Sequence, residues 1–442
     1  MRKFFVSIIL FYLRFFAKLQ LSKINPTIIG VGGGSGKSST SNIIAQILKS
    51  KYKILESKGK NSETGIPLNI LGIEIERYSF SEWLKIIFLV PIKFIANNNK
   101  YDYFVIEMGI DSPFPPKNME YLLRFIKPNI GVLTNIVLEH SIYFESLARS
   151  IDERDRKKEI LRMTAKEEGL LLKSVPEKGL SVVNIDDQNI KSLLPLKSNT
   201  ISVSTKNKEA DFYVKKIEVT EKSFEMTFKF LKEEYTLKIN QPLPSYFATS
   251  FLLAFAVCFY CGIKVQDAIS VIASSFQLPP GRFSVFKGIK NTLIFDSTYN
   301  SSLESTIGGM ELLKDLKTGR RKVGILGDMR ELGGLSQIQH EELAKYIVKN
   351  LDFAILIGPM MSQFTAPILK SSNFNFLSFN DFKNAKSEIE NNIKKDDLIL
   401  VKASQNTLFL ERVVDMLLEN PEDKKLLARR GSFWDKQRRN SN

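Results

Sequence analysis

Short apolar runs alternate with longer amphipathic segments along most of the chain, and this alternation predicts an α/β protein with parallel sheets. Runs such as residues 26–33, 103–109 and 130–136 are of the length and composition expected for buried parallel strands. From Asp211 to Asn240 apolar and polar positions alternate, which is typical of an antiparallel meander with one solvated face. We therefore expect a parallel sheet with a small antiparallel meander in the first part of the chain.

Two later segments divide the chain. Residues 245–262 form a long apolar stretch that predicts a helix buried between layers. The turn-rich segment LPPGRF, residues 278–283, predicts a boundary, and the strand-then-loop pattern beyond it predicts a second, Rossmann-like α/β domain. We expect a central domain over residues 24–279 and a C-terminal domain over residues 280–442. Ligands of open α/β sheets bind at the carboxyl ends of strands, so the cleft between the domains is the expected active site.

The N-terminal segment, residues 1–23, opens with basic residues and continues with an apolar run that Arg14 and Lys18 interrupt. This run is shorter than the roughly 20 apolar residues that a spanning helix needs. Two interpretations are open: a helix lying on a membrane surface, and a helix packed on the protein. A second apolar stretch, residues 82–98, either extends the same membrane-facing patch or packs in the ordinary way.

The net charge of +15 favours anionic partners such as nucleotides, phosphorylated substrates or an acidic membrane surface. No recognisable nucleic-acid module is present, and we expect no nucleic-acid partner. The cysteines, Cys258 and Cys261, lie at helical spacing in an apolar run, which favours a buried helix face and a cytoplasmic protein. The basic stretch 424–440 is interpreted as a solvated end, with a membrane or nucleic-acid contact as the alternative.

The sequence GVGGGSGKSST, residues 30–40, joins a predicted strand to a predicted helix. Glycines in such a loop let backbone N–H groups approach and bind phosphates, helped by the positive end of the helix. Lys37 would supply a charge to the β- and γ-phosphates, and Ser38 a hydroxyl to Mg²⁺. The alternative is a glycine-rich turn with an accidental lysine. The predicted nucleotide-binding set is Gly33, Gly34, Ser35, Gly36, Lys37, Ser38 and Ser39.

The spacing of this P-loop, G-x-x-G-K-S, is shorter than the common pattern and resembles the Mur ligase superfamily of ATP-dependent ligases. Four other segments agree: NSETGIPLNILG from Asn61, KPNIGVLTNIVLEH at residues 127–140, RKKEIL at residues 156–161 and LGDMRELG at residues 326–333. Within the superfamily they are most similar to the D-alanyl-D-alanine-adding, MurF-type ligases. The loop begins at Gly30, so we expect the chain to lack the family's usual N-terminal UDP-binding domain, because roughly 40 residues are needed for unaided folding.

The resemblance also implies roles for individual residues. Lys37, His140 and Lys157 would be catalytic, and Lys157 would carry a carbamate, with Lys158 as the alternative position. The implied metal ligands are Ser38, Glu107, His140 and Lys157, and the implied ATP contacts outside the loop are Asn135, Arg282, Asp296 and Asn300.

The implied activity is ATP-dependent formation of an amide bond in peptidoglycan precursor synthesis. D-alanyl-D-alanine would be added to a UDP-N-acetylmuramoyl-tripeptide-like acceptor through an acyl phosphate, with ATP and Mg²⁺. All the reacting groups are anions, which explains why the site needs Lys37, Arg282 and a metal cation. We expect the enzyme in the cytoplasm, at the inner face of the membrane if the N-terminal helix binds lipid.

The sequence departs from the family pattern at several positions. Tyr246, Phe247 and Ser250 stand where the family has His and Asn residues, so the adenine site must be built differently, for example by stacking. NSSLES, residues 300–305, replaces N-A-N-P-x-S, and Gln405 replaces an arginine that contacts the dipeptide carboxylate. Two alternatives therefore stay open: a superfamily ligase with another acceptor or amino acid, such as a glutamate-chain ligase, and a non-catalytic membrane-associated ATP-binding protein.

Overall fold

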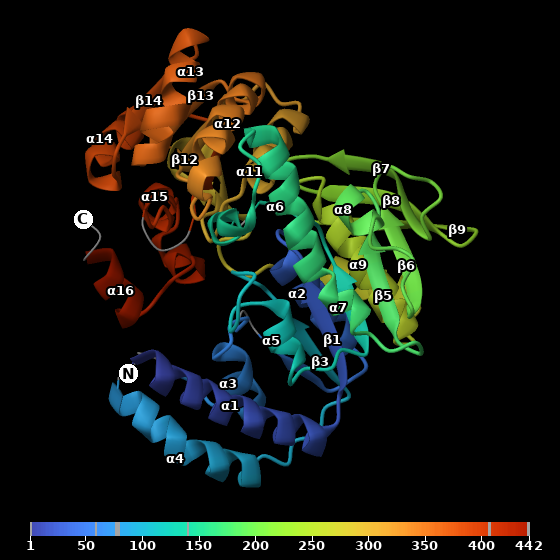
Figure 1. Cartoon of the computed structure of the whole chain (residues 1–442). Coiled ribbons are helices and arrows are strands. Elements are labelled where there is room, and N and C mark those ends of the chain that lie inside the picture. The colour runs from blue at the N-terminus through green and yellow to red at the C-terminus, as the bar shows by residue number, and fades with distance from the viewer. Residues whose placement is uncertain (1, 58–59, 76–79, 139–140, 405–407, 440–442) are drawn as a thin grey trace.

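The computed structural model describes residues 2–57, 60–75, 80–138, 141–404 and 408–439. These residues form two sheets covered by helices, as the sequence pattern predicts (Figure 1). The first sheet contains β1 (Thr27–Gly32), β2 (Ile54–Glu56), β3 (Tyr103–Glu107), β4 (Ile130–Leu133), β5 (Leu180–Asn184), β6 (Asn199–Ser204), β7 (Phe212–Val219), β8 (Phe224–Phe230) and β9 (Glu233–Ile239). The second contains β10 (Ser284–Gly288), β11 (Thr292–Ser297), β12 (Lys322–Gly327), β13 (Phe353–Ile357), β14 (Phe376–Phe379) and β15 (Leu398–Lys402).

The first sheet has the strand order β2-β3-β1-β4-β5-β6-β7-β8-β9. Its strands are parallel as far as β7, and β8 is antiparallel to both of its neighbours, β7 and β9. The predicted meander is therefore confirmed, as a continuation of the parallel sheet. Strand β1 lies between β3 and β4, and the register pairs Val31 with Glu107. This pairing brings the loop that follows β1 beside the carboxyl end of β3.

Helices cover both faces of this sheet. They are α1 (Arg2–Ile24), α2 (Lys37–Lys49), α3 (Gly65–Leu71), α4 (Phe80–Ala96), α5 (Met119–Leu123), α6 (Glu153–Glu168), α7 (Leu170–Lys173), α8 (Gln188–Lys191), α9 (Phe247–Tyr260) and α10 (Val265–Ser275). Helix α9 is the predicted core helix, and its residues from Phe251 to Cys258 are all buried. Both cysteines are free and buried, as expected for a helix face. Within the described residues, no helix combines the length and apolar character needed to cross a membrane.

The second sheet has the order β10-β11-β15-β12-β13-β14, with β10 antiparallel to β11 and the other neighbours parallel. Its helices are α11 (Leu303–Asp315), α12 (Ser336–Asn350), α13 (Ala366–Ser371), α14 (Phe382–Asn392), α15 (Glu411–Leu417) and α16 (Ser432–Arg439). Residues 276–283 join α10 to β10 without helix or strand, and the boundary at residues 279–280 stays a prediction. The parallel order of β11, β15, β12, β13 and β14 fits the predicted Rossmann-like domain.

Residues Arg2–Ile24 fold as one helix, α1, that lies beside α3 and α4 at an edge of the molecule (Figure 1). Leu13 and Ala17 face the core and are fully buried. The second apolar stretch forms α4, and Phe16 of α1 and Phe94 of α4 pack edge to face with ring centroids 5.8 Å apart. The interpretation of α1 as a helix packed on the protein is therefore correct for one of its sides.

Candidate active site

The loop between β1 and α2 has the backbone conformation that its glycines allow. Gly33 and Gly36 have φ angles of 110° and 86°, in the left-handed region that favours glycine. A Cβ atom at Gly33 would also lie 2.4 Å from the Thr134 hydroxyl oxygen and 2.8 Å from the Asn135 carbonyl oxygen. The glycines therefore permit both the sharp turn and its close approach to the end of β4.

Three amides at the start of the loop are held by the protein itself. The N–H of Gly33 donates to the Glu168 carboxylate at 3.0 Å. The N–H groups of Gly34 and Ser35 donate to the backbone and side-chain oxygens of Asn135, at 2.9 Å and 2.8 Å. Asn135, predicted as an ATP contact, thus shapes the loop in this structure. The following amides open helix α2, where N–H groups have no intrahelical acceptor and can bind an anion.

Lys37 and Ser38, the first residues of α2, point to different partners. The Lys37 ammonium donates back to the carbonyl oxygens of Gly33 and Gly34, at 2.5 Å and 2.6 Å. The Ser38 hydroxyl donates to the Glu107 carboxylate at 2.8 Å. Glu107 ends strand β3 and is only 5% exposed. The structure therefore brings together a cation, a hydroxyl and a buried carboxylate at the start of one helix.

Two neighbouring cavities adjoin this cluster and lie between the two sheets. The loop cavity, of about 230 Å³, is lined by residues 34–39, Asn61, Glu107, Asp111, Tyr246, Phe247, residues 281–283, Ser297, Tyr299, Asn300, Ser305 and Lys402. The side cavity, of about 480 Å³, is lined by Ser38, Ser41, Asn42, Glu56, Ser57, Val105, Glu107, residues 277–280, Arg282, Tyr299 and residues 427–429. Ser38, Glu107, Arg282 and Tyr299 line both, so the predicted cleft between the domains is present.

The C-terminal side of the loop cavity is formed by a stacked pair. The Arg282 guanidinium lies over the Tyr299 ring, with its carbon 4.4 Å from the ring centroid. A guanidinium over an aromatic face is stabilised by the ring quadrupole, which also fixes its direction. The pair therefore places a second cation at the cavity that Lys37 lines.

Asp296 lies near the carboxyl end of β11, and Asn300 lies in the segment that follows this strand. Asp296 is fully buried and accepts hydrogen bonds from the N–H and the hydroxyl of Thr298, at 3.1 Å and 2.6 Å. Burial raises the pKa of Asp296 from 3.8 to about 6. Its second carboxylate oxygen has no hydrogen-bond partner among the described residues. The carbonyl of Asn300 accepts a hydrogen bond from the buried Lys402 ammonium at 2.8 Å.

Two family models match the chain over most of this architecture. The Mur ligase middle domain matches residues 31–258, and the Mur ligase, glutamate ligase domain matches residues 281–405. The chain belongs to the Mur ligase family. The first match includes the P-loop and Glu107, and the second begins at Gly281, next to Arg282. Both sides of the loop cavity are thus family features.

Named relatives and solved structures agree with this assignment. The UDP-N-acetylmuramoyl-tripeptide–D-alanyl-D-alanine ligase of Bacillus subtilis is 25% identical over 408 residues, which cover 92% of this Mur ligase and 79% of the relative. The Escherichia coli ligase of the same name is 24% identical over 322 residues, covering 72% and 61%. MurF from Acinetobacter baumannii superposes with a TM-score of 0.71 at 18% identity, covering 93% and 81%. MurF from Thermotoga maritima, solved with ADP, gives 0.70 at 23% identity, covering 94% and 84%. The structural likenesses establish the fold.

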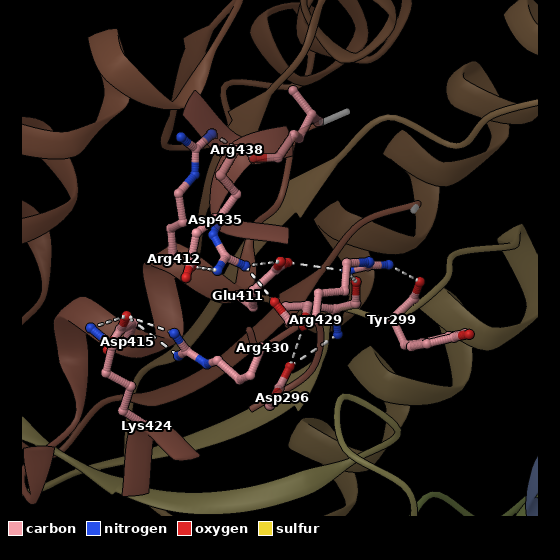
Figure 2. A network of polar contacts seen from close by, with 12 residues as sticks. Asp296, Tyr299, Glu411, Arg412, Asp415, Lys424, Arg429, Arg430, Asp435 and Arg438 are labelled. Carbon is pink, nitrogen blue, oxygen red and sulfur yellow. Dashed lines mark hydrogen bonds and ion pairs between the residues drawn. The ribbon is translucent and has the colours of Figure 1, made fainter. Parts of the chain in front are cut away.

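The C-terminal segment of this Mur ligase supports the stacked pair from behind. Figure 2 shows Arg429 between Glu411 and Tyr299. Arg429 donates to the Glu411 carboxylate and to the carbonyl of Thr298, both at 3.1 Å, and also to the carbonyl of Tyr299. Arg438 of α16 donates to the other oxygen of Glu411 at 3.3 Å.

The interpretation of residues 424–440 as a solvated end is therefore wrong for Arg429 and Arg438. Arg429 and Arg438 are only 8% and 9% exposed. The buried Glu411 carboxylate attracts them, because an ionised group in a low-dielectric interior needs a partner of opposite charge. No local sequence pattern predicts this pairing, since Glu411 is one of many acidic residues.

The two candidate carbamate positions, Lys157 and Lys158, form ion pairs with other carboxylates. The Lys157 ammonium lies 3.6 Å from the Glu342 carboxylate, an ion pair between α6 and α12. Lys158 pairs with Asp155 on the exposed side of α6. His140 and Gln405 lie outside the described residues. The described part of the chain contains no group of three or more His, Cys, Asp and Glu side chains arranged to hold a metal.

The unusual residues of the adenine-site motif form an aromatic cluster. Tyr246 packs against Phe247 with centroids 5.2 Å apart, and against Phe283 at 6.1 Å. Burial raises the pKa of Tyr246 well above its ordinary range, so its hydroxyl stays protonated. In place of the family's polar His and Asn, this Mur ligase lines the cavity with rings, which offer stacking surfaces.

Ser302, in the altered segment 300–305, makes a direct bridge between the domains. Its hydroxyl lies 3.2 Å from the Ser35 hydroxyl of the P-loop. The same hydroxyl caps helix α11 and accepts from the N–H of Ser305 at 3.3 Å. Although segment 300–305 departs from the family pattern, the start of helix α11 still lies against the P-loop.

His340 fixes the backbone of the LGDMRELG segment at Met329. His340 is fully buried, and its Nε2 accepts a hydrogen bond from the N–H of Met329 at 3.1 Å. Burial lowers the pKa of His340, so the neutral ring that can accept this bond is favoured. The end of β12 is held further by Asp328, which accepts from the N–H of Met361 at 2.8 Å.

The residues present fit ATP and Mg²⁺. The Ser38 hydroxyl and Glu107 carboxylate are hard oxygen donors of the kind that Mg²⁺ prefers. Lys37, Arg282 and Lys402 line the same cavity and supply positive charge for phosphates. Volumes of about 230 and 480 Å³ together lie in the range of small-molecule sites.

Proposed function

We propose that this Mur ligase joins D-alanyl-D-alanine to a muramoyl-tripeptide acceptor at the expense of ATP. The observation that carries the proposal is the meeting of Lys37, Ser38–Glu107 and Arg282 at one cavity between the domains. The LGDMRELG segment and the named relatives support the choice of amine. The catalytic alternative is a ligase of the same superfamily with another acceptor or another amino acid, such as a glutamate-chain ligase.

The proposed reaction has two steps, phosphorylation of the acceptor and formation of the amide. The acceptor carboxylate attacks the γ-phosphorus of ATP, so that a carboxyl oxygen–phosphorus bond forms and ADP leaves. The dipeptide amine then attacks the acyl carbon, loses a proton and expels phosphate as the amide forms. Phosphoryl transfer depends mainly on positioning and charge neutralisation, which Lys37 and Arg282 would provide from opposite sides. Mg²⁺ held by Ser38 and Glu107 would supply Lewis-acid stabilisation of phosphate charge.

We propose that Lys37 changes partners when the nucleotide binds. Its ammonium now satisfies the carbonyls of Gly33 and Gly34. A phosphate oxygen carries a full negative charge and forms a stronger hydrogen bond with an ammonium than a neutral carbonyl does. The loop would therefore keep its shape while the side chain turns toward the phosphates.

Two finer assignments belong to the same proposal. The Lys157 carbamate stays a prediction, because the ion pair with Glu342 uses the ammonium form. Bicarbonate-dependent activity that is lost in Lys157→Ala would support the carbamate, and full activity of that variant would exclude it.

The inner face of the membrane is the proposed place of action, supported by the exposed apolar sides of α1 and α4.

The decisive assay incubates the purified chain with ATP, Mg²⁺, the UDP-muramoyl tripeptide and D-alanyl-D-alanine. The expected result is stoichiometric ADP and the pentapeptide product. ADP formed only with another amine would favour the alternative ligase. Nucleotide binding without turnover for any amine would favour a non-catalytic ATP-binding protein.

A further inference from the structure

Two helices at one edge of the molecule expose apolar side chains at regular spacing. Residues three or four apart share one side of a helix, and the exposed residues of both helices follow this spacing. Helix α1 exposes Ile8, Phe11, Phe15 and Leu19, and helix α4 exposes Leu84, Phe88, Ile92 and Ile95, each between 38% and 72% exposed. Each helix therefore carries a continuous apolar stripe that the fold leaves uncovered.

The two stripes belong to one surface. The helices run parallel, because the Tyr12 hydroxyl donates to the carbonyl of Ile87 and the Gln20 amide donates to that of Asn97. Their opposite sides, which include Leu13 of α1 and Val90 of α4, are fully buried in one apolar cluster. Figure 1 shows α1 and α4 side by side at the edge of the molecule. We call the outward surface formed by the eight exposed residues the α1/α4 face.

The charged residues of these two helices are nearly all basic. Helix α1 contains no acidic residue, and Glu82 is the single acidic residue of α4. The basic residues of the two helices are Arg2, Lys3, Arg14, Lys18, Lys23, Lys85 and Lys93. Lys18 and Lys85 are exposed beside the apolar stripes. An apolar surface flanked by cations is complementary to a layer that is apolar inside and anionic outside.

We propose that the α1/α4 face docks on an anionic lipid surface, with both helices lying in its plane. Since the inner sides of the helices are buried in the protein, only the outer stripes are available to lipid. A second copy of the chain fits less well, because it would bring two basic surfaces together. This surface gives a physical basis to the proposed membrane-face location and rests on that proposal.

Docking would hold one side of the active site close to the lipid headgroups. Helix α3 lies against α1 and begins shortly after Asn61, which lines the loop cavity. One short helix therefore separates the α1/α4 face from the loop that carries Asn61. An acceptor located at the membrane would reach the cavity without the enzyme leaving the surface.

Vesicle flotation tests the inference without any ligase substrate. The wild-type chain is mixed with vesicles of phosphatidylcholine alone or with about one-third phosphatidylglycerol. We expect flotation only with the anionic vesicles, and weaker flotation at high salt. The double variant Phe11→Ser/Phe88→Ser should lower partitioning at least about tenfold, because two exposed rings no longer enter the lipid. Lys18→Glu/Lys85→Glu should lower it by a similar factor and weaken its salt dependence.

The matched control is Leu231→Ser/Ile151→Ser, which removes two apolar side chains that are 76% and 96% exposed elsewhere. This control should float like the wild type, and thermal melting should show that every variant is folded. Equal flotation of the wild type and the Phe11/Phe88 variant would overturn the proposal. A wild-type dimer that this variant dissociates, with no vesicle binding, would assign the face to a second copy instead. Turnover with soluble substrates is measured in parallel, so that loss of docking and absence of ligase activity are distinguished.

Discussion

The two sides of the loop cavity are built by different physical means. On the central-domain side, backbone amides and a helix start form the surface, and neutral or singly charged groups such as Asn135 and Glu168 hold it. On the C-terminal side, Arg282 is aligned by an aromatic ring, behind which lies the buried group of Glu411, Arg429 and Arg438. Changes on the first side should therefore affect activity alone, whereas changes on the second should affect stability as well.

The largest expected effect concerns the P-loop lysine. Lys37→Ala should lower kcat/KM by about 10²–10³-fold, because one cation that neutralises transition-state charge is lost. Thermal stability should change little, since the side chain bonds only to its own loop. The control is Lys49→Ala at the other end of α2, where the lysine pairs with Glu56. A Lys37→Ala variant with wild-type turnover would contradict the role of the loop.

The next effect tests the buried charges behind Tyr299. Glu411→Gln should destabilise the protein by about 3–5 kcal/mol, because it leaves two buried guanidinium groups without their anion. Thermal or denaturant unfolding measures this change. Glu419→Gln, an exposed position in the same segment, should change stability by less than about 0.5 kcal/mol. Equal melting of the two variants would mean that the ion group is not a structural support.

Protonation of Asp296 should contribute to the pH dependence of stability. Its folded pKa of about 6 lies above the ordinary value of 3.8, so the folded state binds more protons between these values. Stability from this group is therefore present at pH 4 and is lost as the pH rises through 6, by roughly 2–3 kcal/mol. Asp296→Asn should remove this part of the pH profile. An unchanged difference between the two proteins from pH 4 to 7 would contradict the raised pKa.

A smaller expected effect distinguishes the role of the Tyr299 ring from the role of its hydroxyl. Tyr299→Leu removes the face on which Arg282 lies and should raise the KM for ATP about 5–10-fold, or about 1 kcal/mol. Tyr299→Phe keeps the ring and should behave like the wild type. If both variants bind ATP equally, the stacking does not orient Arg282.

The smallest expected effect lies at the bridge between the two sides. Ser302→Ala removes the cap of α11 and the contact with Ser35, and should cost about 1 kcal/mol of stability. Ser305→Ala, which removes the other half of the capping box, is the comparison. A larger loss of turnover in Ser302→Ala than in Ser305→Ala would show that the bridge contributes to catalysis.

The features that could be predicted from the sequence are those that local pattern determines. The P-loop and the meander follow from residues close in the chain, and the position of Glu107 at the end of a parallel strand follows from the apolar run before it. Arg282 was found only through the family resemblance. These predictions rest on short segments whose geometry the fold class already implies.

The features that could not be predicted depend on contacts between distant segments. Glu168 bonds to Gly33 across 135 residues, and Arg429 bonds to the carbonyl of Tyr299 across 130. Lys402 bonds to the carbonyl of Asn300 in the same way, across 102 residues. Nothing in the local sequence distinguishes these charged residues from solvated ones, because their burial is decided by the packing of the whole chain. The sequence leaves open whether α1 and α4 pack on the protein or face a membrane, because an apolar helix side suits both.

The account depends most directly on the claim that one nucleotide is held from both sides of the cavity. Titration of ATP with Mg²⁺ into the wild type, Lys37→Met, Arg282→Leu and the double variant measures this by calorimetry. We expect each single change to weaken binding at least about tenfold, and the double change to weaken it further. Binding by Arg282→Leu with wild-type affinity, while Lys37→Met loses it, would confine the nucleotide to the central domain and contradict the account.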